Sequence, residues 1–238
     1  MNRQPFEPTA AFRHTLRDES ADIWQAIFAL PFLQELSTSR LPLDRFAFFI
    51  AQDLLYLDEF ARVLAMGAAR STEPRTQEMF LRHAQNVSFV EQALHSTIAP
   101  QIGLDPDVVR QQEPAPVTTA YTDHLLRVAH SGHLAELVAA ILPCYEVYRR
   151  VGEHLASAPP QHPLYATWVA SYASPEFGRA VEEQLELADR LATHADVATC
   201  ERMATYYRRS IRYEWMFWQQ AYDRLAWPVG RTARDKEP

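Results

Sequence analysis

The run LPCYEVY, residues 142–148, holds the side chains with the clearest chemical potential. Cys144 and Tyr148 are four residues apart, and residues at this spacing share one face of a helix. A thiol beside a phenol on an inward face predicts a covalent site lined by aromatic rings. Taken alone, the run fits a buried structural cysteine better, because free cysteine is among the most buried residue types.

Two carboxylates lie within strongly apolar segments and are candidates for the same site. Asp53 lies mid-way along the apolar stretch 48–57, with Tyr56 three residues further on the same face. Glu214 lies among four aromatic residues in the run 213–218, where an apolar environment raises the pKa of a carboxyl and suits it to proton transfer. On these runs alone, each acid could equally lie at a solvent edge or on an interface helix.

Metal-ligand spacings give little support for a metal centre. Glu91 and His95 are spaced i, i+4, and His130 and His133 are spaced i, i+3. Carboxylate-bridged di-metal bundles use Glu-x-x-His pairs, and the sequence contains none. It also lacks a glycine-rich phosphate loop, a Gly-x-Ser-x-Gly elbow and a CxxC pair. We therefore expect neither a metal nor another cofactor.

Composition narrows the class of protein. The chain has 238 residues, 47% hydrophobic, with six glycines and a formal charge of −7. Its basic residues are scattered, which argues against nucleic-acid binding. No apolar run approaches the roughly 20 residues of a membrane span, and the N-terminus lacks a signal-peptide pattern. Two cysteines make no disulfide framework, so we expect a cytoplasmic protein in which Cys200 serves only helix packing.

Apolar residues recur every three or four positions, and no stretch alternates as a strand would. A short turn is expected after Pro31, and the stretch 101–116 should be irregular, with room for one short helix. The predicted helices cover about 9–29, 41–70, 74–99, 117–131, 133–157, 164–172, 175–194 and 196–225. We predict a single all-α domain over 1–238, with its core at about 9–227 and a frayed tail at 228–238. The nearly continuous apolar faces indicate either a central helix or a subunit interface.

Five motifs stand in order along the chain. They are Gln52-Asp53-x-x-Tyr56-Leu57, Tyr121-Thr122-x-His124-Leu125, Leu142-Pro143-Cys144-Tyr145, His162-Pro163-x-Tyr165-x-x-Trp168 and Tyr213-Glu214-x-x-Phe217-Trp218. In this order and at this spacing they resemble the TenA proteins, also called thiaminase II or aminopyrimidine aminohydrolase, from about residue 12 to residue 227. The resemblance implies a haem-oxygenase-like helical bundle without haem, usually a homotetramer.

The resemblance also implies roles for particular residues. Cys144 corresponds to the catalytic nucleophile, Glu214 to the acid/base carboxylate, and Asp53 to the acid that binds the pyrimidine amino group. The substrate-binding set further includes Tyr56, Tyr121, Tyr148, Tyr172 and Phe217. The implied reaction converts 4-amino-5-aminomethyl-2-methylpyrimidine to the 5-hydroxymethyl pyrimidine and ammonia, and many family members also cleave thiamine more slowly.

The sequence departs from the family pattern at two places, and two other functions remain possible alternatives to the hydrolase. Glu146 and the pair Arg149-Arg150 are more charged than the family pattern leads one to expect, which leaves the preference between aminomethyl pyrimidine and thiamine open. One alternative is a metal-dependent oxidase built on the same bundle. The other is a non-catalytic pyrimidine carrier or regulatory protein, which would have no need of a thiol.

Overall fold

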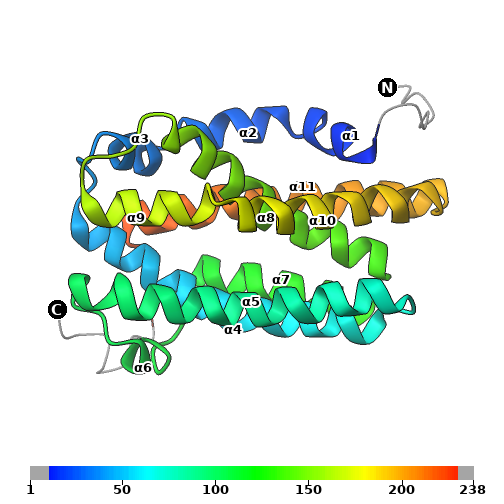
Figure 1. Ribbon diagram of the computed structural model, residues 1–238, viewed down its shortest axis with the longest axis horizontal. Coiled ribbons are helices and arrows are strands. Elements are labelled where there is room, and N and C mark those ends of the chain that lie inside the picture. The colour runs from blue at the N-terminus through cyan, green and yellow to red at the C-terminus, as the bar shows by residue number, and fades with distance from the viewer. Residues whose placement is uncertain (1–10, 230–238) are drawn as a thin grey trace.

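Figure 1 shows the computed structural model, which describes residues 11–229, with only the backbone described for residues 88–96. Within this range every regular element is helical. The elements are α1 (Phe12–Asp18), α2 (Ala21–Phe28), α3 (Pro31–Ser37), α4 (Leu43–Arg70), α5 (Pro74–Thr97), η1 (Ala99–Ile102), α6 (Pro106–Val109), α7 (Pro116–Ser131), α8 (Leu134–Ala156), α9 (Pro163–Tyr172), α10 (Pro175–Thr193) and α11 (Val197–Asp223). The predicted all-α class is confirmed.

The helices form a layered bundle with its longest members roughly parallel or antiparallel (Figure 1). Helices α1 to α3 run along one side, α4, α5 and α7 along the other, and α8 and α11 lie between them. Helix α8 packs against α11, α10 and α9, while α4 packs against α5, α7 and α11. Side chains from α4, α8 and α11 can therefore meet in the middle of the bundle.

Local sequence signals account for where several helices begin. Proline occupies the first turn of α3, α7, α9 and α10, where its missing N–H is not needed. The Ser174 hydroxyl accepts a hydrogen bond from the Phe177 N–H at 3.2 Å, and the Asp196 carboxylate accepts one from the Thr199 N–H at 2.7 Å. Such caps satisfy N–H groups that the first turn leaves without helical partners.

The predicted first helix and the turn after it are wrong. The stretch 9–29 is interrupted at Ser20, whose φ of −117° and ψ of 13° lie outside the helical range, so that α1 packs on α10 while α2 packs on α11. Residues 31–37 form a helix because Pro31 starts it and Phe32, Leu33 and Leu36 bury one face. The apolar spacing is visible in the sequence, and Pro31 begins this helix instead of only ending the preceding one.

Two central helices explain the continuous apolar faces noted in the sequence. Every residue from 49 to 57 in α4 and from 135 to 148 in α8 is buried within one chain. A helix that is apolar all round is typical of a core helix, so no partner subunit is needed to cover either segment. One continuous hydrophobic cluster runs from Phe12 to Ala221. The single-domain assignment stays a prediction, and the tail 230–238 lies outside the described residues.

None of the described helices is long and apolar enough to cross a membrane.

Candidate active site

All eight predicted site residues are buried around one region at the centre of the bundle. They come from five helices: Asp53 and Tyr56 from α4, Tyr121 from α7, Cys144 and Tyr148 from α8, Tyr172 from α9, and Glu214 and Phe217 from α11. Burial raises the pKa of Tyr148 and of Tyr172 most, and Asp53, Cys144 and Glu214 each raise it further, as expected for polar groups that lie near one another. Phe217 joins them through a ring contact with Tyr56 at 5.8 Å.

The Cys144 thiol lies in an environment that disfavours its charged form. Burial raises the pKa of Cys144 well above its ordinary value, and the nearby Glu214 and Asp53 carboxyls raise it further. The neighbouring Tyr56 hydroxyl acts in the opposite direction and lowers the pKa of Cys144 by more than Asp53 raises it, although this hydroxyl makes no regular hydrogen bond to any residue that the structure describes. The resting thiol is therefore protonated at neutral pH, and a base must remove its proton before it can attack.

The two carboxyls titrate near neutral pH. Burial raises the pKa of Asp53 from 3.8 to about 7, and burial together with the charge of Asp53 raises the pKa of Glu214 from 4.5 to about 8. The Tyr121 hydroxyl opposes the second shift by donating a hydrogen bond of 2.6 Å to Glu214 Oε1. Groups with such values can exchange protons with a substrate at physiological pH.

Two polar atoms of the site lack partners among the described residues. Asp53 Oδ2 and the Tyr56 hydroxyl are both buried without a hydrogen bond. Buried polar groups are almost always satisfied in folded proteins, by protein, water or ligand. A bound molecule that donates to Asp53 and bonds to Tyr56 would remove both deficits.

Aromatic rings form the walls of the site. Tyr56 lies 5.1 Å from Tyr121, and Tyr148 lies 4.8 Å from Tyr172, measured between ring centroids. Trp218 packs on Tyr148 at 5.4 Å. A flat aromatic ligand placed among such rings gains about 0.5–1.5 kcal/mol per ring pair beyond the burial of its area.

Buried amides fix the helix that carries Tyr121. The Gln52 side-chain oxygen accepts from the Ala115 N–H at 2.9 Å and from the Thr118 hydroxyl at 2.8 Å. The Gln220 side-chain oxygen accepts from the Val117 N–H at 2.8 Å. Helix α4, which carries Asp53, and α11, which carries Glu214, thus both hold the start of α7, and Tyr121 is oriented towards Glu214.

A glycine allows α9 to approach α8 closely. A Cβ atom at Gly152 would lie 2.8 Å from the carbonyl carbon of Tyr172 and 2.8 Å from its Cβ, distances that real Cβ atoms essentially never show. Two of the three nearest atoms, the Tyr172 carbonyl carbon and the Ala173 nitrogen, are backbone, and the third is a Cβ fixed directly to the backbone, so none can rotate away. Gly152 therefore permits the contact that places Tyr172 against Tyr148.

The Glu146 carboxylate, which is unusual for the family pattern, contacts residues of two other helices and not the thiol. Glu146 is buried and pairs with Arg17 of α1 at 2.6 Å, and the Tyr207 hydroxyl of α11 donates to it at 2.9 Å. This cluster fixes α8 to α11 two residues from Cys144. Glu146 therefore supports the position of the helix that carries Cys144. Together with Arg149 and Arg150 it also lines a surface pocket.

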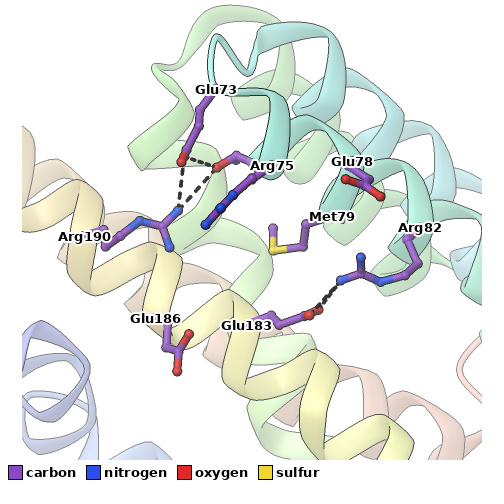
Figure 2. Close-up of a pocket in the computed structure, with 9 residues that line it drawn as sticks. Glu73, Arg75, Glu78, Met79, Arg82, Glu183, Glu186 and Arg190 are labelled. Carbon is purple, nitrogen blue, oxygen red and sulfur yellow. Dashed lines mark hydrogen bonds and ion pairs between the residues drawn. The ribbon is translucent and has the colours of Figure 1, made fainter.

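A second chain of polar contacts links α8 to α5 and α10 through Tyr145. The Tyr145 hydroxyl lies 3.1 Å from His83 Nδ1, and His83 Nε2 lies 2.8 Å from a Glu183 oxygen. Burial lowers the pKa of His83, so the neutral ring carries its proton on Nε2, facing the carboxylate, and Nδ1 accepts from Tyr145. Glu183 also lines a charged surface pocket of about 530 Å³ between α5 and α10 (Figure 2). None of the eight site residues lines that pocket.

Within the described residues, neither the histidines nor the second cysteine forms part of a metal-binding group. Among the described residues, no group of three or more His, Cys, Asp or Glu side chains is placed to hold a metal ion. The side chains of Glu91 and His95 lie outside the described residues. Cys200 is a buried free thiol on α11 whose Sγ lies 3.7 Å from the Ala192 carbonyl oxygen, in a packing position.

Phe60 and Gly152 are contributors that were not predicted from the sequence. Phe60 stacks on Tyr56 at 5.5 Å and also contacts Tyr145 at 5.8 Å. Its i, i+4 spacing from Tyr56 is a signal that could have identified it. Gly152 gave no such signal, because its role depends on how closely another helix approaches.

The fold and site define a helical bundle with a buried thiol, two buried carboxyls and an aromatic wall. A family profile described as TENA/THI-4/PQQC matches residues 17–224. The chain is 35% identical to a Bacillus subtilis protein named aminopyrimidine aminohydrolase, over 91% of this chain and 92% of that protein. It therefore belongs to the TENA/THI-4/PQQC family.

Solved structures agree with this assignment. A TenA homologue from P. horikoshii OT3 superposes with a TM-score of 0.83 at 26% identity, covering 90% of this chain and 99% of the other. A domain with a heme oxygenase-like fold from Shewanella denitrificans superposes with a TM-score of 0.72 at 16% identity, covering 89% and 92%. The predicted haem-oxygenase-like fold is confirmed.

Proposed function

We propose that this protein is a thiamine-salvage hydrolase that converts 4-amino-5-aminomethyl-2-methylpyrimidine to the 5-hydroxymethyl pyrimidine and ammonia, and that can cleave thiamine at the same carbon. The observation that carries the proposal is the meeting of Cys144, Glu214 and Asp53 inside one ring-lined site. The family relationship, which includes relatives named aminopyrimidine aminohydrolase, supports the same reaction.

Cys144 acts as the nucleophile in this proposal. Direct displacement of ammonia from the methylene carbon is slow because ammonia leaves poorly. Attack of the thiolate on C6 of the ring forms a C–S bond, breaks the aromatic system and pushes an electron pair towards C5, which expels ammonia from the methylene. Water then adds to the methylene, the C–S bond breaks, and the aromatic ring is restored.

Glu214 moves the protons that these steps require. Its carboxylate is close enough to influence the thiol, and with a pKa of about 8 it can accept the thiol proton and return it to a ring nitrogen or to the amine. The hydrogen bond from Tyr121 keeps this carboxyl in place. Asp53 binds the exocyclic amino group of the ring, which satisfies its unpartnered Oδ2.

Product formation is the direct test. The protein is incubated separately with the aminomethyl pyrimidine and with thiamine, while ammonia, hydroxymethyl pyrimidine and thiazole are followed. Cys144→Ser should lose nearly all turnover and retain pyrimidine binding, whereas Cys200→Ser, the matched control at the other buried thiol, should keep full activity. Full activity in Cys144→Ser would remove the nucleophile assignment. Binding of both compounds by the unaltered protein with no product would favour a carrier.

We also propose a cytoplasmic homotetramer made of single-domain subunits, as the family resemblance implies. Sedimentation equilibrium of the purified protein measures the subunit number directly. A monomer at micromolar concentration would contradict this assembly.

A further inference from the structure

Among the described residues, the acids of the site differ from the other buried acids because no cationic side chain is paired with them. Glu146 pairs with Arg17, and Glu136 pairs with Arg202 at 2.5 Å. Asp53 and Glu214 are only 2% and 1% exposed. In the part of the chain that the structure describes, no arginine, lysine or histidine forms a hydrogen bond or ion pair with either, and none shifts the pKa of either.

This isolation has an energetic consequence. A buried carboxylate without a partner is expensive, and the group avoids the cost by remaining protonated. The remaining titratable groups of the site supply no positive charge, because they are one thiol and four tyrosines. Burial raises the pKa of each of these groups well above its ordinary value: Cys144, Tyr56, Tyr121, Tyr148 and Tyr172. A site of this kind can become neutral by binding protons or by binding a cation.

The aromatic wall is suited to the second possibility. Tyrosine faces attract cations through the ring quadrupole, and the attraction is stronger at desolvated sites than at exposed ones. The unpartnered Asp53 Oδ2 offers an acceptor to the same ligand. Both features favour a flat molecule that carries a positive charge.

We propose that the site selects pyrimidines with one positive charge on the group that leaves the C5 methylene, and that binding this cation expels a proton from the Asp53–Glu214 pair. The proposal rests on the function proposed above and specifies its substrate class. An aminomethyl substrate carries an ammonium at this position and thiamine carries a thiazolium, so one rule covers both. The hydroxymethyl product is neutral, and a phosphorylated pyrimidine would bring negative charge towards two acids.

The same charge assists the chemistry. A cation beside the pair favours the ionised carboxylates, and it also favours the Cys144 thiolate over the thiol. The nucleophile is therefore activated when the correct substrate is present and stays protonated in the empty site. Once the leaving group departs as neutral ammonia, the pair takes a proton back and the neutral product loses its electrostatic attraction.

Calorimetry on Cys144→Ser, which prevents turnover, tests the proposal. Thiamine and the hydroxymethyl pyrimidine are titrated near neutral pH in two buffers of different ionisation enthalpy, and the protons released are obtained from the difference in heat. Thiamine should release about one proton, and its affinity should rise about tenfold per pH unit below neutrality. The hydroxymethyl pyrimidine has the same ring amino group but no cation, so it should release clearly fewer protons and its affinity should depend more weakly on pH.

The double variant Asp53→Asn with Glu214→Gln, built on Cys144→Ser, isolates the source of the effect. Proton release and the preference for thiamine over the neutral pyrimidine should both disappear, while circular dichroism checks that the bundle is folded. Equal affinity for the charged and neutral ligands, or thiamine binding without proton release, would overturn the cation rule. Turnover by the unaltered protein is measured separately, so the cation rule can fail while the hydrolase proposal stands, and the reverse also holds.

Discussion

Replacing Asp53 with asparagine tests how isolated its carboxyl is in the folded protein. Burial raises its pKa from 3.8 to about 7, a difference of roughly three units, and each unit corresponds to about 1.4 kcal/mol. The ionised carboxylate therefore costs the folded state on the order of 4 kcal/mol. Because the folded pKa lies above the unfolded one, this cost is absent below about pH 4 and grows as the pH rises to about 7.

The magnitude can be measured as a difference between two proteins. Between about pH 5 and about pH 8.5, the wild type should lose about 3 kcal/mol of unfolding free energy from this single group. Asp53→Asn has nothing to ionise, so its stability relative to the wild type should increase by that amount over the same interval. The loss of the Asp53 charge also lowers the pKa of Glu214, which acts in the same direction.

Urea unfolding at the two pH values supplies the free energies, and the slopes check that the transition remains two-state. Asp123→Asn on the exposed face of α7 is the matched control, and its effect should stay within about 0.5 kcal/mol at both pH values. A constant difference between Asp53→Asn and wild type would show that the Asp53 carboxyl is hydrated or paired, and the electrostatic reasoning about the site would be wrong.

Three further substitutions have defined outcomes. Glu214→Gln should remove the limb near pH 8 from the pH–rate profile and lower kcat by about 10²–10⁴-fold; an unaltered profile would assign proton transfer elsewhere. Gly152→Ala should lower the free energy of unfolding by about 1–3 kcal/mol and raise KM, because the added Cβ displaces Tyr172. Gly178→Ala is the control: no atom lies within 4 Å of its added Cβ, so it should be neutral or stabilising. Equal effects of the two variants on thermal unfolding would refute the packing argument. Glu146→Gln should lower stability by about 1–3 kcal/mol, because it leaves the half-buried Arg17 without its counter-charge; unchanged urea midpoints would show that this cluster is not needed.

The helical class, most helix limits and the burial of the two acids could be predicted from the sequence. Asp53 and Glu214 were candidates because burying an acid within an apolar run is costly unless it has a function or a partner. The structure has both residues buried near Cys144. The aromatic run around Glu214 likewise fixed which face of α11 points inward. Such local contrasts between one polar residue and its apolar neighbours are visible without coordinates.

Features that depend on contacts between distant helices could not be predicted. The break at Ser20 lets α1 pack mainly on α10 while α2 packs on α11, and Glu146 is buried because Arg17, far away in the sequence, neutralises it. That no described cation is paired with Asp53 likewise depends on how all the surrounding helices pack. The sequence contains many arginines, and only the structure shows that none of those described is paired with this acid.

The distribution of the site over five helices has a consequence for biosynthesis. Asp53 leaves the ribosome long before Glu214, and α11 is made after every other helix that the structure describes. Until α11 docks, the inner face of α8 has no cover from Phe217 and Trp218, so a stalled or truncated chain presents a bare thiol to cellular oxidants. We expect nascent chains that stop before α11 to label rapidly with a thiol reagent at Cys144, and the completed protein to label slowly.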